Sequence, residues 1–255
     1  MTNTVDYTHP QWIERRKPKS SADLLDVARG ITGDKLLLSF SGKDSLAMWL
    51  YLRENGFSII PYLLYTVPLR IDVEMREYYQ DFFGQKIYFL PHPIFYHMLA
   101  LNRFQPPHIA ARLTKLDLPF YDFKAIEDVL ASENGMENYL SAVGYLAGDQ
   151  AGRRSFIVRS GPIGITNRKY YMAIWDWKAS QVMDKMHQYK VKLPYHYRVW
   201  GNTGTGRPYE YLGLKELEKF CPDDYELLLK WFPLKSVEKF RYEVVNEYAK
   251  SHSRN

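Results

Sequence analysis

Thiols are almost absent from this sequence, because its 255 residues contain a single cysteine, Cys221. A disulfide within the chain is therefore impossible, and a zinc or iron–sulfur site built on several thiolates is excluded. The sequence also lacks an apolar run long enough to span a bilayer and an N-terminal segment with the pattern of a signal peptide. We therefore expect a cytoplasmic protein.

The balance of charge and apolar residues limits the class of protein further. Hydrophobic residues make up 46% of the chain, which is enough for a sizeable core and argues against global disorder. The net charge of +5 suits a phosphate-bearing ligand or nucleic acid without proving either. The 21 Tyr and 6 Trp can pack in a core or offer stacking surfaces.

One stretch, residues 35–45, predicts a binding site. It starts as an apolar run that is typical of a buried strand, passes through two small residues, and continues as a helix that Gly56 is placed to end. The first amides of such a helix have no partner within it, and its dipole favours an anion there. The alternative is an ordinary strand, turn and helix with a polar N-cap. The candidate phosphate-binding residues are Ser39, Phe40, Ser41, Gly42, Lys43, Asp44 and Ser45.

Further strands are expected at 58–66, 86–90 and 142–149, with helices at 21–30 and 73–83. Alternating strands and helices predict an α/β fold with a doubly wound parallel sheet, whose ligands bind beyond the carboxyl ends of the strands. Arg153 and Arg154 follow the last of these strands, and adjacent guanidinium groups suit a bidentate hold on phosphate or sulfate oxygens. The alternative for this pair is a solvated basic loop.

The motif at residues 42–45 resembles the pyrophosphate-binding loop of the ATP pyrophosphatase superfamily, Ser-Gly-Gly-x-Asp-Ser, with Ser41 where that loop has a glycine. Together with Arg153-Arg154 and the Trp-Asp-Trp run at 175–177, it is similar to the phosphoadenosine phosphosulfate reductase family in its phage or mobile-element form. The arginine segment resembles that family's Gly-x-Arg-Arg-x-x-Ser-x-x-Arg, although the spacing before the pair differs. The resemblance implies an adenine-nucleotide site to which further residues contribute: Tyr65, Thr66, Val67, Gly148, Asp149 and Arg159.

The reductases of this family attack their substrate with a cysteine in a C-terminal Glu-Cys-Gly-x-His motif, which this chain lacks. Reduction is therefore disfavoured. In the wider superfamily, ATP and Mg²⁺ react with a second substrate, which is adenylylated while pyrophosphate leaves. The resemblance then implies that Lys43, Arg153 and Arg154 supply positive charge during catalysis. It further implies that Asp44 or Asp149 helps to hold Mg²⁺.

Three functions remain open at this level. We expect an ATP-dependent enzyme that releases pyrophosphate, with a nucleobase as one candidate substrate. A sulfonucleotide oxidoreductase and a non-catalytic nucleotide-binding regulator are the alternatives. Nucleic acid, a DNA-binding protein or a second copy of the chain are possible partners.

We expect a basic arm at 1–20, a nucleotide-binding domain at 21–212 and a helical extension at 213–255, with helices at 214–220, 223–232 and 234–250. The glycine-rich loop at 195–209 suits a lid, a contact with single-stranded nucleic acid, or a plain surface loop. Trp175 and Trp177 can stack on a base or pack in the core.

Overall fold

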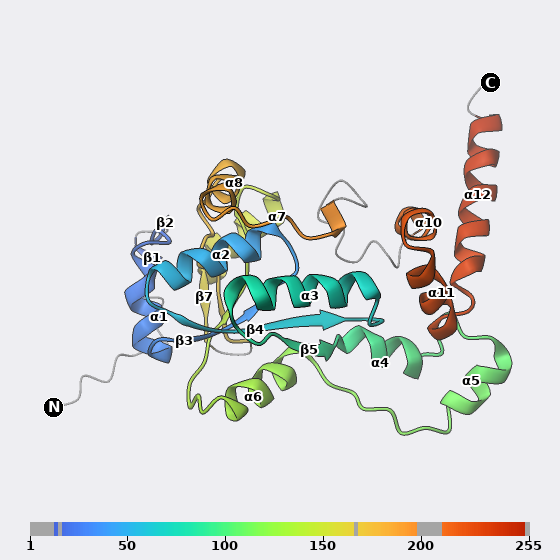
Figure 1. The fold of residues 1–255 in the computed structure, drawn as a ribbon, viewed down its shortest axis with the longest axis horizontal. Coiled ribbons are helices and arrows are strands. Elements are labelled where there is room, and N and C mark those ends of the chain that lie inside the picture. Colours follow the sequence, from blue (N-terminus) through green and yellow to red (C-terminus); the bar gives the residue numbers. More distant parts are fainter. Residues whose placement is uncertain (1–12, 15–16, 166–167, 198–210, 253–255) are drawn as a thin grey trace. The chain divides into compact units, whose positions relative to one another are not determined.

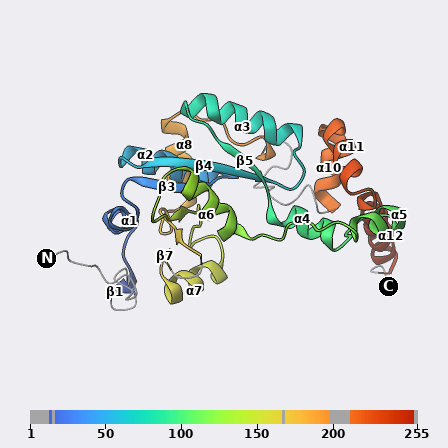
Figure 2. The same ribbon diagram turned by 90° about the horizontal axis from the view of Figure 1, so that it is seen from below.

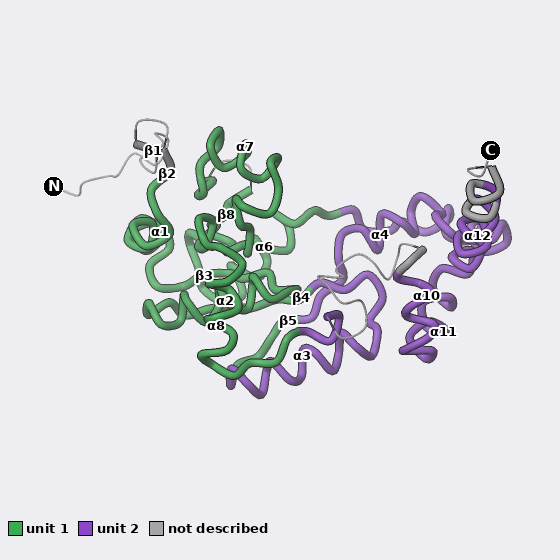
Figure 3. Tube along the Cα trace, turned by 90° about the horizontal axis from the view of Figure 1, so that it is seen from above, with its two compact units in different colours: residues 1–63, 85–88, 121–193 green, residues 64–84, 89–120, 194–255 purple. Residues whose placement is uncertain are grey.

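The computed structural model describes residues 13–14, 17–165, 168–197 and 211–252. The chain forms two compact units, each assembled from separate segments (Figure 3). Unit 1 comprises residues 1–63, 85–88 and 121–193, and unit 2 comprises residues 64–84, 89–120 and 194–255. This division differs from the expected boundary at residue 212, because residues between 64 and 120 share a hydrophobic core with the C-terminal helices.

A six-stranded sheet runs in the order β5-β4-β3-β6-β8-β7. Strand β3 pairs in parallel with β4 on one side and with β6 on the other, β6 is parallel to β8, and β7 is antiparallel to β8. The predicted doubly wound α/β class is confirmed. The strands are β3 (Lys35–Ser39), β4 (Ser58–Tyr65), β5 (Tyr88–Pro91), β6 (Ser141–Ala142), β7 (Ile163–Gly164) and β8 (Tyr170–Tyr171).

Helices cover both faces of the sheet in unit 1. Helices α2 (Lys43–Glu54) and α8 (Ala179–Gln188) lie on one face, and α6 (Phe123–Glu133) lies on the other (Figures 1 and 2). The chain passes from β3 through α2 to β4, whereas β6 joins β3 on the opposite side. The strand order therefore reverses between β3 and β6, and doubly wound sheets bind their ligands at such a point, outside the carboxyl ends of the strands.

Helix α2 is the element that joins the sheet to the candidate phosphate site. Its predicted apolar face is buried, including Trp49, whose exposed fraction is 0%. Gly56 follows the helix with a φ of 80°, a left-handed conformation that glycine adopts without strain. Its N–H donates to the Arg53 carbonyl at 3.0 Å, so the predicted helix end is confirmed.

The strand expected at 142–149 is a correction, because β6 ends at Ala142. The Val143 N–H still donates to Tyr171 O, but the Tyr145 N–H donates to Val143 O at 2.9 Å, and this tight turn takes the chain out of the sheet. Arg153 and Arg154 consequently do not follow a strand directly. They lie in the first turn of helix α7 (Ala151–Ser160).

Unit 2 is built around its own apolar core. Side chains of α4 (Pro93–Ala100), α10 (Tyr211–Phe220) and α11 (Pro222–Trp231) meet there with Val67, Leu69 and Ile71. The Asp224 carboxylate accepts the first N–H groups of α3 (Arg70–Phe83), from Arg70 at 2.6 Å and from Ile71 at 3.1 Å. The unit also contains α5 (Pro107–Leu113) and α12 (Lys235–His252).

The remaining elements of unit 1 precede the sheet. They are β1 (Ile13–Glu14), β2 (Lys17–Pro18) and α1 (Leu24–Thr32). Helix α1 starts later than expected, because Ser21 instead bonds Asp176. Most of the expected basic arm and most of the 195–209 loop lie outside the described residues. None of the helices in the described part of the chain combines the length and the hydropathy that crossing a membrane requires.

Candidate functional site

The turn between β3 and α2 is closed by one side chain, Ser45. Its Oγ accepts the N–H of Ser41 at 3.0 Å and the N–H of Gly42 at 3.2 Å, and its hydroxyl donates to the Gly42 carbonyl at 2.8 Å. Gly42 is the N-cap residue in an extended conformation, with a φ of −145°. The N–H groups of Ser41 and Gly42 are therefore satisfied within the turn, whereas the N–H groups in the first turn of an α-helix have no carbonyl partner inside the helix.

Lys43 and Asp44 form an ion pair at the start of α2. The Lys43 Nζ lies 2.6 Å from Asp44 Oδ1, and the two side chains are 20% and 16% exposed. Asp44 is the acidic residue in the first turn, a position that the helix dipole favours. An anion that binds here can take Lys43 as its counter-ion. Lys43 would then exchange its partner Asp44 for the ligand.

Gly144, two residues after β6, packs directly on this turn. A Cβ built on Gly144 would lie 2.7 Å from the Ser45 nitrogen and 2.9 Å from the Asp44 carbonyl carbon, too close for any other residue without a backbone shift. The parallel register pairs Leu38 with Ala142, which sets the two strand ends level. The loops after β3 and β6 therefore meet at the point where the strand order reverses.

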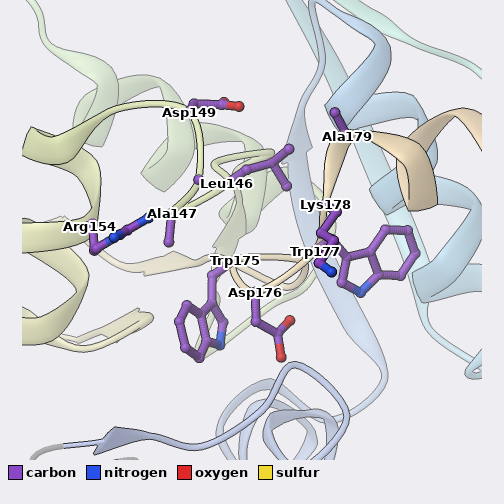
Figure 4. A pocket seen from close by; sticks show the side chains of 10 residues that line it. Leu146, Ala147, Asp149, Arg154, Trp175, Asp176, Trp177, Lys178 and Ala179 are labelled. Carbon is purple, nitrogen blue, oxygen red and sulfur yellow. The ribbon is translucent and has the colours of Figure 1, made fainter.

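A cavity of about 460 Å³ lies at the carboxyl ends of β6 and β8. Residues 146–149 with Arg154 form one wall, and residues 175–179 form the other (Figure 4). The walls are joined by the Ala147 N–H, which donates to Trp175 O at 2.8 Å. The residues that line the cavity are Leu146, Ala147, Gly148, Asp149, Arg154, Trp175, Asp176, Trp177, Lys178 and Ala179.

The two carboxylates of the cavity are held by neighbours in the protein. Asp149 Oδ2 lies 2.6 Å from Arg153 Nη1, and the Arg153 guanidinium also lies 4.5 Å from the centre of the Tyr145 ring. Asp176 accepts the backbone N–H of Ser21 at 3.1 Å and the Ser21 hydroxyl. Arg153 is thereby placed against Asp149 and Tyr145, whereas Arg154 lines the cavity.

Both tryptophan side chains of the cavity are held by contacts with other parts of the protein. The Trp175 Nε1–H donates to the Lys19 carbonyl at 3.1 Å. The Trp177 ring meets Tyr51 of α2 edge to face, with centroids 5.1 Å apart. Burial, and after it the charge of Asp176, raises the pKa of Tyr51. Both indoles are half-buried, and they combine a packing role with a place in the cavity wall.

Three expected site residues, Tyr65, Thr66 and Val67, belong to unit 2. The Tyr65 ring lies 4.4 Å from the ring of Phe89, and burial, followed by the nearby Tyr96, raises the Tyr65 pKa. Val67 is fully buried in the core of unit 2. Among the three, Tyr65 is half-buried, whereas Thr66 and Val67 are buried.

The other expected residues separate into two groups within unit 1. Residues 39–45 form the turn at the end of β3, whereas Gly148, Asp149 and Arg154 line the cavity. Arg159 is exposed in the last turn of α7. No group of three or more His, Cys, Asp or Glu side chains that could hold a metal ion occurs among the described residues.

Two residues of this region, Gly144 and Lys178, are not predicted as site residues from the sequence. The strand expected at 142–149 conceals Gly144, because the glycine would then lie in the middle of a strand. With the strand end at Ala142, a glycine two residues later is the signal of a close backbone approach. Lys178 precedes α8 directly and lines the cavity, and its position next to Trp177 was the available signal.

A comparison with models of protein families finds no match for this chain, and a comparison with curated proteins finds no significant relative.

Proposed function

We propose that this protein binds ATP with its phosphates on the turn formed by residues 39–45, and that it uses the nucleotide to adenylylate a second substrate. The observation that carries the proposal is the meeting of the β3 and β6 loops at the reversal of strand order. There, Gly144 lies against the first turn of α2, and Lys43 stands beside it. Nucleotides bind doubly wound sheets at this kind of position.

The turn offers the groups that a pyrophosphate chain needs. Amides in the first turn of α2 act as donors, the positive end of the helix dipole favours the anion, and Lys43 supplies a full charge. The Ser45 hydroxyl acts within the protein, since it is engaged with Ser41 and Gly42. Its role is to hold the shape of the turn.

The proposed reaction needs positioning and charge rather than a covalent protein intermediate. An oxygen of the second substrate attacks the α-phosphorus, and the bond from that phosphorus to the bridging oxygen breaks. Pyrophosphate leaves with the bonding electron pair, and the proton of the attacking hydroxyl passes to solvent. Lys43 and the α2 amides favour this step because they hold the charge that collects on pyrophosphate.

Mg²⁺ accompanies ATP in this proposal and neutralises part of its charge. Asp44 and Asp149 provide carboxylate oxygens of the kind that Mg²⁺ accepts, and each is already balanced by a cation of the protein. Mg²⁺ usually takes one or two carboxylates and completes its shell with phosphate oxygens and water. Asp44 is the nearer candidate to the phosphates, because it lies in the turn itself.

Sulfonucleotide reduction is the less favourable alternative because of the environment of Cys221. This thiol lies in unit 2 at the start of α11, and its Sγ lies 3.8 Å from the Tyr195 hydroxyl. Burial raises the Cys221 pKa, although the contact with Tyr195 lowers it in part. A nucleophilic thiol needs the opposite shift, because the thiolate is the reactive form.

Calorimetry with ATP and Mg²⁺ on the full chain tests the proposal. Lys43→Ala should weaken ATP binding about tenfold or more, since hydrogen bonds to charged groups contribute roughly 1.5–3 kcal/mol each. Lys124→Ala is the matched control, because Lys124 pairs with Asp128 on the exposed surface of α6. ATP binding that is equal in wild type and Lys43→Ala contradicts the assignment of the turn.

Release of pyrophosphate separates the enzyme from a nucleotide-binding regulator. A coupled pyrophosphate assay should give turnover with ATP, Mg²⁺ and an extract of small nucleotides, and Lys43→Ala should lower it. Tight ATP binding without release of pyrophosphate under any substrate mixture supports the regulator instead.

A further inference from the structure

The cavity at the carboxyl ends of β6 and β8 shares no lining residue with the turn at residues 39–45. We propose that it is a separate binding site for a phosphorylated nucleoside. Its role as the site of the second substrate rests on the proposed function, whereas the binding itself does not. A free mononucleotide and a 5′-phosphorylated end of a single strand share this chemistry.

The charges of the cavity predict an anionic ligand. Asp149 is paired with Arg153, and Asp176 accepts two hydrogen bonds from Ser21. In the described part of the chain, no carboxylate forms an ion pair with Arg154 or Lys178, although both line the cavity and both are exposed. Two cations on opposite walls, neither paired with a carboxylate, suit the oxygens of one phosphate group. The planar guanidinium of Arg154 can bind two of these oxygens at once.

The walls and the volume predict the rest of the ligand. Trp175 and Trp177 both line one wall, and both rings are held by contacts with other parts of the protein. Stacking of a base on an aromatic side chain tolerates every base, because each base has a π face. A volume of about 460 Å³ lies within the usual range for sites of small organic ligands.

The location of the cavity explains why two ligands would meet here. The proposed ATP site lies between β3 and β6, and the cavity lies between β6 and β8, one strand further along the same edge of the sheet. Residues 143–149 link the two, because Gly144 contacts the turn and Leu146 begins the cavity wall. A phosphorylated nucleoside in the cavity is thereby placed next to the phosphates of ATP.

Titration of the full-length protein with GMP and UMP, followed by tryptophan fluorescence and by calorimetry, tests this site. Binding should quench the fluorescence of Trp175 and Trp177. Guanosine and inorganic phosphate should each bind at least tenfold more weakly than GMP, because guanosine lacks the phosphate group and inorganic phosphate lacks the base. A 5′-phosphorylated hexanucleotide is titrated in parallel, and the tighter of the two ligands identifies the source of the phosphate.

Arg154→Ala and Lys178→Ala should each weaken GMP binding about tenfold, and Arg154→Lys should restore it poorly, because lysine lacks the planar fork. ATP affinity should stay within twofold of wild type in these variants. Lys43→Ala should show the reverse pattern, and Lys124→Ala should change neither ligand.

The two proposals can fail separately. Wild-type protein that binds neither GMP nor the hexanucleotide overturns the cavity assignment, and so does GMP binding that is unchanged in both Arg154→Ala and Lys178→Ala. Loss of GMP binding in Lys43→Ala with normal binding in Arg154→Ala also overturns it, because the ligand would then occupy the turn. Absent ATP binding with intact GMP binding defeats the proposed function alone.

Discussion

Gly144 faces the backbone nitrogen of Ser45 at a distance that leaves no room for a side chain, because a Cβ on Gly144 would lie 2.7 Å from that nitrogen. This contact joins the loop after β6 to the first turn of α2 across the reversal of strand order. Backbone atoms are in contact on both sides, so neither partner can yield by rotating a side chain. The shape of the turn therefore depends on a residue about 100 positions away in the sequence.

We expect Gly144→Ala to distort the turn and to lower ATP affinity at least tenfold, with a loss of thermal stability. The extra methyl group has to push the α2 amides or the β6 loop aside. Gly152→Ala is the matched control, since a Cβ there meets nothing within 4 Å. Alanine in the exposed first turn of α7 should leave the melting temperature unchanged or slightly raised. Equal ATP affinity in Gly144→Ala and wild type would show that the turn does not bind the nucleotide.

Glu54 at the end of α2 predicts a pH-dependent contribution to stability. It lies 2.7 Å from Lys185 Nζ and accepts the Tyr189 hydroxyl at 2.6 Å, which ties α2 to the end of α8. Burial alone would raise the Glu54 pKa, but the hydrogen bonds from Lys185 and Tyr189 leave the pKa lowered. A lowered pKa means that the folded state releases the proton more readily, so the contribution is present at neutral pH and is lost as pH falls through the folded pKa.

The test compares thermal unfolding of wild type and Glu54→Gln at pH 7 and at pH 3. At pH 7 the variant should be less stable by up to about 1 kcal/mol, which is the usual limit for partly exposed ion pairs. The difference in melting temperature should shrink toward zero at pH 3. A difference that is as large at pH 3 as at pH 7 would mean that packing, and not the carboxylate charge, decides the stability of this contact.

The local pattern of the sequence was sufficient to predict the elements whose signals lie within a few residues. The apolar run of β3, the small residues at the turn and the stop at Gly56 gave the correct strand, turn and helix, and the alternation of elements gave the correct class. The sequence predicts strand β6 too long, because the apolar residues at 143–146 are equally suited to a loop that buries Leu146 and leaves Tyr145 exposed. A two-residue strand carries almost no periodic signal.

The site could be predicted only in part, because spacing along the chain does not show which polar side chains bond one another, nor that Gly144 meets the backbone of Ser45. The sequence predicts Ser45 in the phosphate-binding turn, and what it does not show is that the Ser45 hydroxyl is engaged with Ser41 and Gly42. The sequence predicts a joint role for Arg153 and Arg154, and what it does not show is that Arg153 pairs with Asp149 while Arg154 lines a cavity. Both contacts are local, since Ser45 bonds residues three and four positions before it and Arg153 pairs with a residue four positions before it, but the second contact depends on where α7 begins.

Cys221 provides a prediction about thiol chemistry. Its raised pKa should shift the pH dependence of alkylation by iodoacetamide to higher pH than that of a free cysteine, because the thiolate is the reactive form. Cys221→Ser should leave ATP binding and any release of pyrophosphate unchanged. Turnover that disappears in Cys221→Ser with an unchanged melting temperature would instead support thiol chemistry and the reductase alternative.

The last prediction concerns a carboxylate that is fully buried beneath the sheet. Glu127 of α6 is 0% exposed, and its Oε1 accepts the Tyr62 hydroxyl at 2.8 Å and lies 3.2 Å from Arg168 Nη2. Within the described residues, Oε2 has no hydrogen-bond partner. The carboxylate therefore depends on few donors. Removing one of them should lower the free energy of unfolding, because a buried charge with unmet hydrogen bonds is strongly unfavourable.

Tyr62→Phe removes one of these donors and should destabilise the protein by about 1–3 kcal/mol, which urea unfolding can measure. Tyr139→Phe is the matched control, because it removes a hydrogen bond of 2.7 Å to Asp128, whose side chain is 44% exposed and also paired with Lys124. Water can replace that hydroxyl, so the control should lose less than about 1 kcal/mol. Adding Glu127→Gln to Tyr62→Phe should recover part of the loss, since the neutral amide is less costly to bury than the carboxylate. Equal losses in Tyr62→Phe and Tyr139→Phe would show that burial of the acceptor does not set the strength of these hydrogen bonds.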